Sequence, residues 1–168
     1  MQYTMKLKFI YLFVLIGFSQ SSVVGQNLLF IGEYSFSCSE TSTLTSDSEK
    51  YFINDLNIVF AKYKRKTFLA VSTETSDVYI TGKLIIYLND GRVISLANQI
   101  VSDYVNNISS VAYHIPIEDL EIIKASNINK VRFTLTDEFG SHGAFGGNFT
   151  ASNNSKLDFS ALISSFFR

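Results

Sequence analysis

The chain has 168 residues, with 14 basic and 15 acidic side chains and a formal net charge of −1 at pH 7. This length suits one domain better than two, and a hydrophobic fraction of 46% is enough to build a core. The near-neutral charge excludes a general electrostatic attraction to nucleic acid. We therefore expect no nucleic-acid partner.

Residues 1–25 have the composition of a cleavable secretory leader. Two lysines precede an unbroken apolar run at residues 9–18, and small, weakly polar residues follow as far as Gly25. The run is shorter than the roughly 20 residues that a membrane-spanning helix needs. Val23 and Gly25 satisfy the small-residue preference of a cleavage site. These features predict cleavage before Gln26, a secreted or periplasmic location, and no membrane span in the mature chain.

Cys38 is the only cysteine, so the mature chain has no internal disulfide. The leader holds two of the 14 basic residues and none of the 15 acidic ones, which gives the mature chain a formal charge of −3. If residues 28–38 form one strand, Cys38 shares an apolar face with Phe30 and Phe36, because side chains alternate along a strand. We expect a buried thiol, with intermolecular pairing as the alternative.

Two hairpins are predicted after a polar loop at residues 39–50. Residues 56–60 and 67–71 alternate in polarity on either side of a basic turn. Residues 78–88 and 93–96 do so around the tripeptide Asn-Asp-Gly, whose residues tolerate the positive φ angles of a tight turn.

The next elements are expected to be a polar loop at residues 98–110, a strand at 111–115 and a short helix near 117–125. Pro116 is well placed to open that helix, and acidic residues follow it in the first turn, where they suit the helix dipole. A further strand is predicted at residues 130–136.

The C-terminal part has a different composition. Residues 139–154 are rich in glycine and asparagine, which is typical of a loop. Apolar residues at helical spacing then predict a helix near 156–166, although their alternation also permits a strand. Ser155 stands three residues before Asp158, which is the spacing of a helix-capping pair.

These patterns predict a single, mainly β (α+β) domain over residues 26–168. Its expected architecture is an antiparallel sheet or β-sandwich with two short helices.

Residues 79–137 have an order of segments that is found in known proteins. The segments YLNDGRVISL, SDYVNN, YHIPIEDLEIIKAS and INKVRFTL follow one another in this part of the chain. In this order they resemble small uncharacterised secreted proteins of Bacteroidota. Ile115 stands where those proteins tend to have a capping Ser or Thr. The resemblance implies the fold and an exported bacterial setting, and it implies no activity or site residue.

Catalytic candidates are few, because the chain has only two histidines. His142 lies close in sequence to Asp137 and Glu138, which is the one neighbourhood that suits acid-base chemistry. There is no nucleophile-elbow motif, and the glycines after residue 139 do not have the spacing of a phosphate-binding loop. We expect no metal and no cofactor.

Binding candidates fall into three groups. Aromatic residues in the glycine-rich segment offer a recognition rim, Tyr104 offers a stacking face in the predicted loop 98–110, and the basic turn offers attraction to an acidic polymer or lipid headgroup. Solvation of the basic turn is the simpler interpretation. The remaining residues of these groups are Phe139, Phe145, Phe149, Lys64, Arg65 and Lys66.

These observations lead to three functional hypotheses. The first is a non-enzymatic binding module of the cell envelope, with an envelope protein or a surface polymer as partner. The alternatives are a small secreted hydrolase that uses His142 with Asp137 or Glu138, and a structural envelope component.

Overall fold

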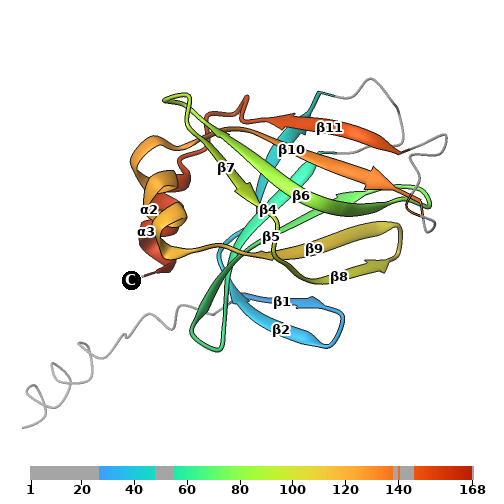
Figure 1. Cartoon of the computed structure of the whole chain (residues 1–168). Helices are drawn as coiled ribbons and strands as arrows, with labels where there is room; N and C mark the ends of the chain where they lie inside the picture. Colours follow the sequence, from blue (N-terminus) through green and yellow to red (C-terminus); the bar gives the residue numbers. More distant parts are fainter. Residues whose placement is uncertain (1–26, 48–54, 138–139, 141–145, 168) are drawn as a thin grey trace, which may run out of the picture.

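The structure is a computed structural model, and it describes residues 27–47, 55–137, 140 and 146–167. The leader lies outside these residues, so its cleavage remains a prediction. In the described residues strands dominate and pair antiparallel, and two short helices accompany them, one between β9 and β10 and one after β11, which confirms the predicted fold class (Figure 1). The strands are β1 (Asn27–Ile31), β2 (Tyr34–Cys38), β3 (Ser42–Ser46), β4 (Leu56–Tyr63), β5 (Lys66–Glu74), β6 (Tyr79–Leu88), β7 (Val93–Leu96), β8 (Gln99–Val105), β9 (Ile108–His114), β10 (Ile128–Thr136) and β11 (Gly147–Ser152). The helices are α2 (Ile117–Ser126) and α3 (Phe159–Phe166).

The sheet is continuous and curves until it is nearly barrel-like. Its strands follow the order β7-β6-β10-β11-β3-β4-β5-β9-β8, and β2 adds the β1–β2 hairpin to β4. Strands β6 and β9 lie far apart in this order, yet the curvature of the sheet brings them close enough to form hydrogen bonds. The Tyr113 hydroxyl donates to the Gly82 carbonyl at 3.1 Å, and the Ile80 amide donates to the Ser109 hydroxyl at 2.8 Å. Burial raises the pKa of Tyr113.

The interior is filled by alternate side chains of the strands, as period-two patterning requires. Leu56, Ile58 and Phe60 of β4 all point into it. Both helices cover one end of the sheet (Figure 1) and contribute apolar side chains to the same core. The Phe159 ring of α3 lies 6.2 Å from the Phe60 ring. Burial of the apolar side of each helix, more than intrinsic helix propensity, stabilises such short helices.

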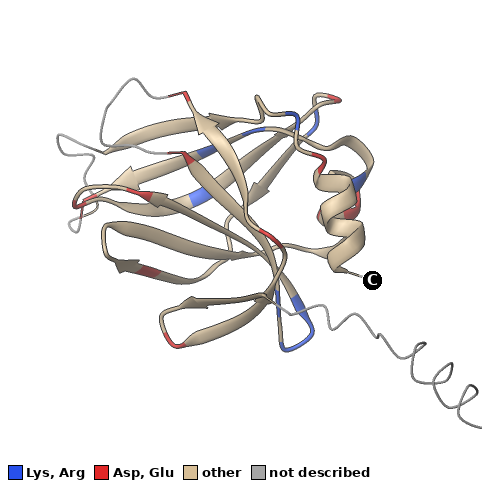
Figure 2. Ribbon diagram, turned by 180° about the vertical axis from the view of Figure 1, so that it is seen from behind, with Lys and Arg blue, Asp and Glu red and all other residues tan. Residues whose placement is uncertain are grey.

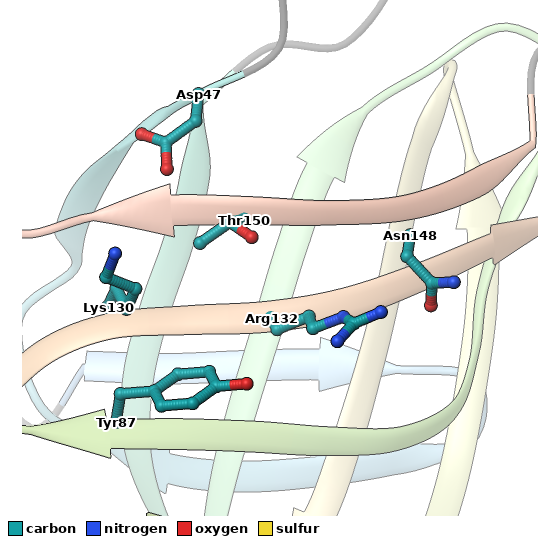
Figure 3. A pocket seen from close by; sticks show the side chains of 6 residues that line it. All are labelled: Asp47, Tyr87, Lys130, Arg132, Asn148 and Thr150. Carbon is teal, nitrogen blue, oxygen red and sulfur yellow. The ribbon is translucent and has the colours of Figure 1, made fainter. Parts of the chain in front are cut away.

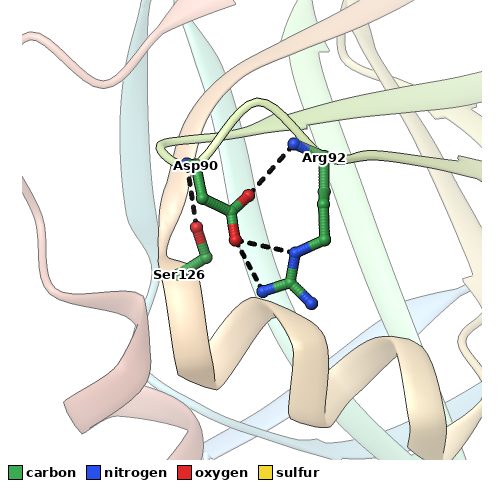
Figure 4. Close-up of polar contacts among 3 residues, drawn as sticks. All are labelled: Asp90, Arg92 and Ser126. Carbon is green, nitrogen blue, oxygen red and sulfur yellow. Dashed lines mark hydrogen bonds and ion pairs between the residues drawn. The ribbon is translucent and has the colours of Figure 1, made fainter.

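The predicted hairpins are present as β4–β5 and β6–β7. In the β6–β7 turn Gly91 has a φ of +88°, a conformation that L side chains rarely adopt. Asp90 accepts from the Arg92 backbone amide at 3.0 Å and pairs with its guanidinium at 2.7 Å (Figure 4). The Asp90 amide donates to the Ser126 hydroxyl at 3.0 Å, which ties this turn to the end of α2.

Residues 28–38 form a hairpin, whereas the sequence predicted one strand. Gly32, with a φ of +54°, begins the reversal between β1 and β2. The face predicted to be buried is buried in β2, whereas β1 buries its opposite face. Phe36 and Cys38 are buried, while Leu28 and Phe30 are exposed. The predicted burial of the Cys38 thiol is confirmed, and this burial raises its pKa.

Three predicted loops contain strands. Residues 42–46 of the polar segment 39–50 form β3, residues 98–110 contain β8 and the start of β9, and residues 147–152 of the glycine-rich segment 139–154 form β11. Strand β8 has a neighbour on one side only, so its side chains are largely exposed and give no hydrophobic alternation.

The C-terminal helix is present, but its cap differs from the prediction. Asp158 is the cap residue, and its carboxylate accepts from the Ala161 amide at 3.0 Å. Ser155 does not cap the helix, which begins at Phe159.

Candidate functional site

The structure separates the predicted site residues. The basic residues Lys64, Arg65 and Lys66 are exposed at the β4–β5 turn, whereas Tyr104 lies on β8 near the opposite end of that hairpin. Asp137 directly follows β10. Four further candidates lie outside the described residues: Glu138, Phe139, His142 and Phe145.

Phe149 belongs to the core instead of a loop. It lies on β11 with only 8% of its surface exposed, and its ring is 5.9 Å from that of Phe133. Packing accounts for this side chain, so we do not include it in a binding surface.

Tyr104 lines a small pocket of about 230 Å³, with Tyr79, Ser102, Asp103 and Ser109. Its ring lies 4.9 Å from the Tyr79 ring. The Tyr104 hydroxyl accepts from the Asp77 amide at 3.1 Å and lies 3.2 Å from the Thr75 carbonyl. These contacts hold the loop between β5 and β6, so the polar end of Tyr104 already has a structural role.

A larger groove of about 440 Å³ lies on the outer face of β6, β10 and β11 (Figure 3). Its lining combines two cations, one aromatic ring, one amide, one hydroxyl and one carboxylate. These belong to Lys130, Arg132, Tyr87, Asn148, Thr150 and Asp47.

Strand register brings these side chains together. Lys130 is paired with Tyr87 of β6, and Arg132 is paired with Thr150 of β11. Paired residues on antiparallel neighbours point to the same face, as do residues two apart on one strand. The core side chains of β10 alternate with these residues and point inward. The groove is therefore the polar outer face of strands whose inner face builds the core.

The acidic and amide groups at the rim are already held in place. Asp47 accepts from the Ser152 hydroxyl at 3.1 Å, and Asn148 accepts from the Thr134 hydroxyl at 2.9 Å. The side-chain amide nitrogen of Asn148 carries the hydrogens that a ligand can use.

Within the described ranges, no hydrogen bond or ion pair occupies the side-chain donors of the two cations. In the described part of the chain, the ion pairs are Asp90–Arg92 and Glu121–Lys124, so neither Lys130 nor Arg132 forms one there. Lys130 is half-buried on the groove floor, while Arg132 is exposed. A guanidinium offers a planar pair of donors that fits a carboxylate, and an ammonium offers a point charge. Tyr87 adds a face on which a sugar ring can stack.

Among the described residues, the groove lining includes no histidine, cysteine or serine. Across the described ranges, no group of three or more His, Cys, Asp or Glu residues could hold a metal ion. No helix within those ranges is long and apolar enough to cross a membrane. The two cations, the amide and the hydroxyl of the described lining can donate hydrogen bonds to a polar, negatively charged group.

Sequence reasoning missed this groove, because its residues come from four separate segments between Asp47 and Thr150. A usable signal was present in the polar positions of the strand 130–136, which alternate with the core residues and include two cations. Only the pairing of β10 with β6 and β11 shows what lies beside them. Comparisons with protein families, with curated proteins and with solved structures found no match to this chain.

Proposed function

We propose that the protein is an exported, non-enzymatic binding module of a bacterial envelope, and that it binds an acidic surface polymer in the groove on β6, β10 and β11. Export rests on the leader, and the bacterial setting rests on the resemblance of residues 79–137. The observation that carries the proposal is the presence of two cations without ion-pair partners in the described residues, beside a tyrosine and an amide.

The spacing of the cations supports a polymer with repeated charges. Lys130 and Arg132 are two residues apart on the same face of β10, so their Cα atoms lie roughly 7 Å apart. Acidic sugars in a chain present carboxylates on successive units, and their rings provide flat faces for Tyr87. A polyuronate therefore has both of the chemical features that the groove recognises.

Rigidity also supports a binding role. The groove residues from β10 lie on a strand with partners on both sides, and β10 and β11 pair over six residue positions. Side chains on paired strands are held more firmly than those on loops, so less conformational entropy is lost when a ligand binds.

The test is a titration of the protein, recovered from an exporting host, with polygalacturonate and with neutral dextran. We expect Lys130→Gln/Arg132→Gln to weaken polygalacturonate binding at least tenfold, since a hydrogen bond to a charged group contributes about 1.5–3 kcal/mol. The matched control is Lys64→Gln/Arg65→Gln, which removes the same charge from another surface. Equal weakening by both variants, or equal binding of dextran and polygalacturonate, would contradict the proposal.

A further inference from the structure

The β4–β5 turn carries an unexpected pair of residues. Lys64 and Arg65 form a two-residue turn with φ angles of +46° and +65°. Such turns favour Asn-Gly, because side chains with a Cβ are disfavoured at positive φ. The β8–β9 turn has the same form and places Asn106 and Asn107 at +53° and +64°. The β4–β5 turn thus has exposed cations at positions of positive φ, whereas the β8–β9 turn has asparagines, which tolerate positive φ. Unfavourable backbone conformations of this kind concentrate at functional sites.

Exposed apolar side chains lie on the same side of the molecule. Phe30 and Leu28 of β1 are 68% and 59% exposed, the highest values among the large apolar residues that are described. Both point away from the cluster that the β1–β2 hairpin covers, since Leu29 and Ile31 occupy its inner face. A single exposed apolar residue needs no explanation, but a pair beside a basic turn does.

Strand pairing connects the two features. Leu28 is paired with Ser37, and Ser37 is also paired with Lys62 of β4. Two strand spacings separate Leu28 from Lys62, which is roughly 10 Å. Lys62 stands two residues before Lys64 of the turn, and its ammonium lies 4.7 Å from the Phe166 ring centre and 4.8 Å from that of Phe167. Figure 2 shows the blue turn and the β1–β2 hairpin projecting from the same side of the protein, away from the groove strands.

We propose that this basal surface, formed by Leu28, Phe30, Lys64, Arg65 and Lys66, docks on an anionic lipid bilayer. Cations beside exposed apolar groups match the boundary between lipid headgroups and acyl chains, where apolar side chains insert and cations meet anionic headgroups. An acidic polysaccharide would use the charges and leave Leu28 and Phe30 in water. The charge complementarity and the apolar pair together therefore favour lipid.

This surface is separate from the groove, and the inference goes beyond the proposed function. The groove lies on β6, β10 and β11, while the basal surface is formed by β1 and the β4–β5 turn. Docking at the basal surface would leave the groove accessible to a polymer ligand. Either proposal can fail without the other.

Sedimentation with vesicles tests the inference, using protein recovered from an exporting host. The vesicles are phosphatidylcholine alone, or phosphatidylcholine with 30% phosphatidylglycerol, at 50 mM and 500 mM salt. We expect partitioning onto the anionic vesicles only, with strong reduction at high salt. Since each cation near an anionic surface contributes about 1 kcal/mol, Lys64→Gln/Arg65→Gln/Lys66→Gln should lower the partition coefficient at least tenfold. Leu28→Ser/Phe30→Ser should lower it severalfold at low salt.

The groove variant Lys130→Gln/Arg132→Gln is the control, because it removes two positive charges from another face. Its partition coefficient should stay within twofold of the wild type. The inference is overturned if this control weakens vesicle binding as much as the turn variant, or if the wild type does not sediment with anionic vesicles. Binding of polygalacturonate that depends on the turn, without vesicle binding, would assign the basal surface to a polysaccharide and overturn the lipid assignment.

Discussion

Two parts of the outer face of the curved sheet differ in polarity and in what covers them. On β4, β5 and β9 the outer face is apolar and lies under the β1–β2 hairpin, with Phe36 packed against Phe68 at a ring distance of 5.4 Å. On β6, β10 and β11 the outer face is polar and forms the open groove.

Small side chains make the covered face possible. Val59, Ala70 and Ala112 are consecutive partners across β4, β5 and β9, and all three are buried. Their small volume allows the hairpin to lie close to the sheet. Gly32 anchors the far end of the hairpin, because its amide donates to the Asp103 carboxylate of β8 at 2.9 Å. The contrast is therefore between a part of the outer face that is closed by packing and a part that is left open and polar.

The largest expected effect comes from opening the covered face. Phe36→Ala removes a fully buried ring from the hairpin, and loss of a buried Phe costs about 3–5 kcal/mol of unfolding free energy. Phe30→Ala, on the exposed face of the same hairpin, should change it by less than about 0.5 kcal/mol. Urea unfolding of both variants measures the difference. Similar losses would show that the hairpin does not cover the sheet as described.

Overpacking gives the next largest effect. Ala112→Leu adds volume beneath the hairpin and should lower the unfolding free energy by about 1–3 kcal/mol. Thr150→Leu adds similar volume on the open face, where space is available, and should have a much smaller effect. The same urea titrations compare the two, and equal destabilisation would contradict the distinction between a covered and an open face.

The positive φ angles of Lys64 and Arg65 should lower the free energy of unfolding by about 1 kcal/mol. Lys64→Asn/Arg65→Gly supplies residues that accept positive φ, so the variant should be more stable by about that amount. The reverse exchange in the β8–β9 turn, Asn106→Lys/Asn107→Arg, should destabilise by a similar amount. Thermal unfolding of both variants tests this symmetry. A destabilised Lys64→Asn/Arg65→Gly variant would show that the basic residues contribute to folding.

The smallest effect concerns pH at the turn next to the open face. Hydrogen bonds from Arg92 lower the pKa of Asp90 to about 2. A lowered pKa stabilises the fold above the unfolded value near 4, and this contribution is lost as pH falls toward 2. Asp90→Asn should therefore lower the melting temperature slightly at pH 6 and by much less at pH 2, where part of the carboxyl is protonated in the folded state. An equal difference at pH 6 and pH 2 would contradict a role for the charge.

The sequence predicts the position of a strand with a buried inner face better than it predicts which side chains of other strands are buried. Residues 78–88 alternate clearly because one side meets the core, and the turn residues Asn89, Asp90 and Gly91 mark the end of this segment. Strand β8 was missed because an edge strand has few buried positions. The division of residues 28–38 depends on the Gly32 reversal and on packing against another strand, neither of which follows from alternation.

The candidate site could be predicted only in part for a related reason. The basic turn is contiguous in sequence, so Lys64, Arg65 and Lys66 could be identified directly. The groove depends on which strands become neighbours, and nothing local specifies that Tyr87 lies beside Lys130.

Chemical-shift mapping of backbone amides during a polygalacturonate titration tests the central claim most directly. We predict the largest shifts at residues 85–87, 130–132 and 148–150, which form the open face, and little change at Ala61, Ala70 and Ala112 beneath the hairpin. Shifts confined to residues 62–67, or the absence of any saturable shift on β6, β10 and β11, would contradict the assignment of the open face as the binding face.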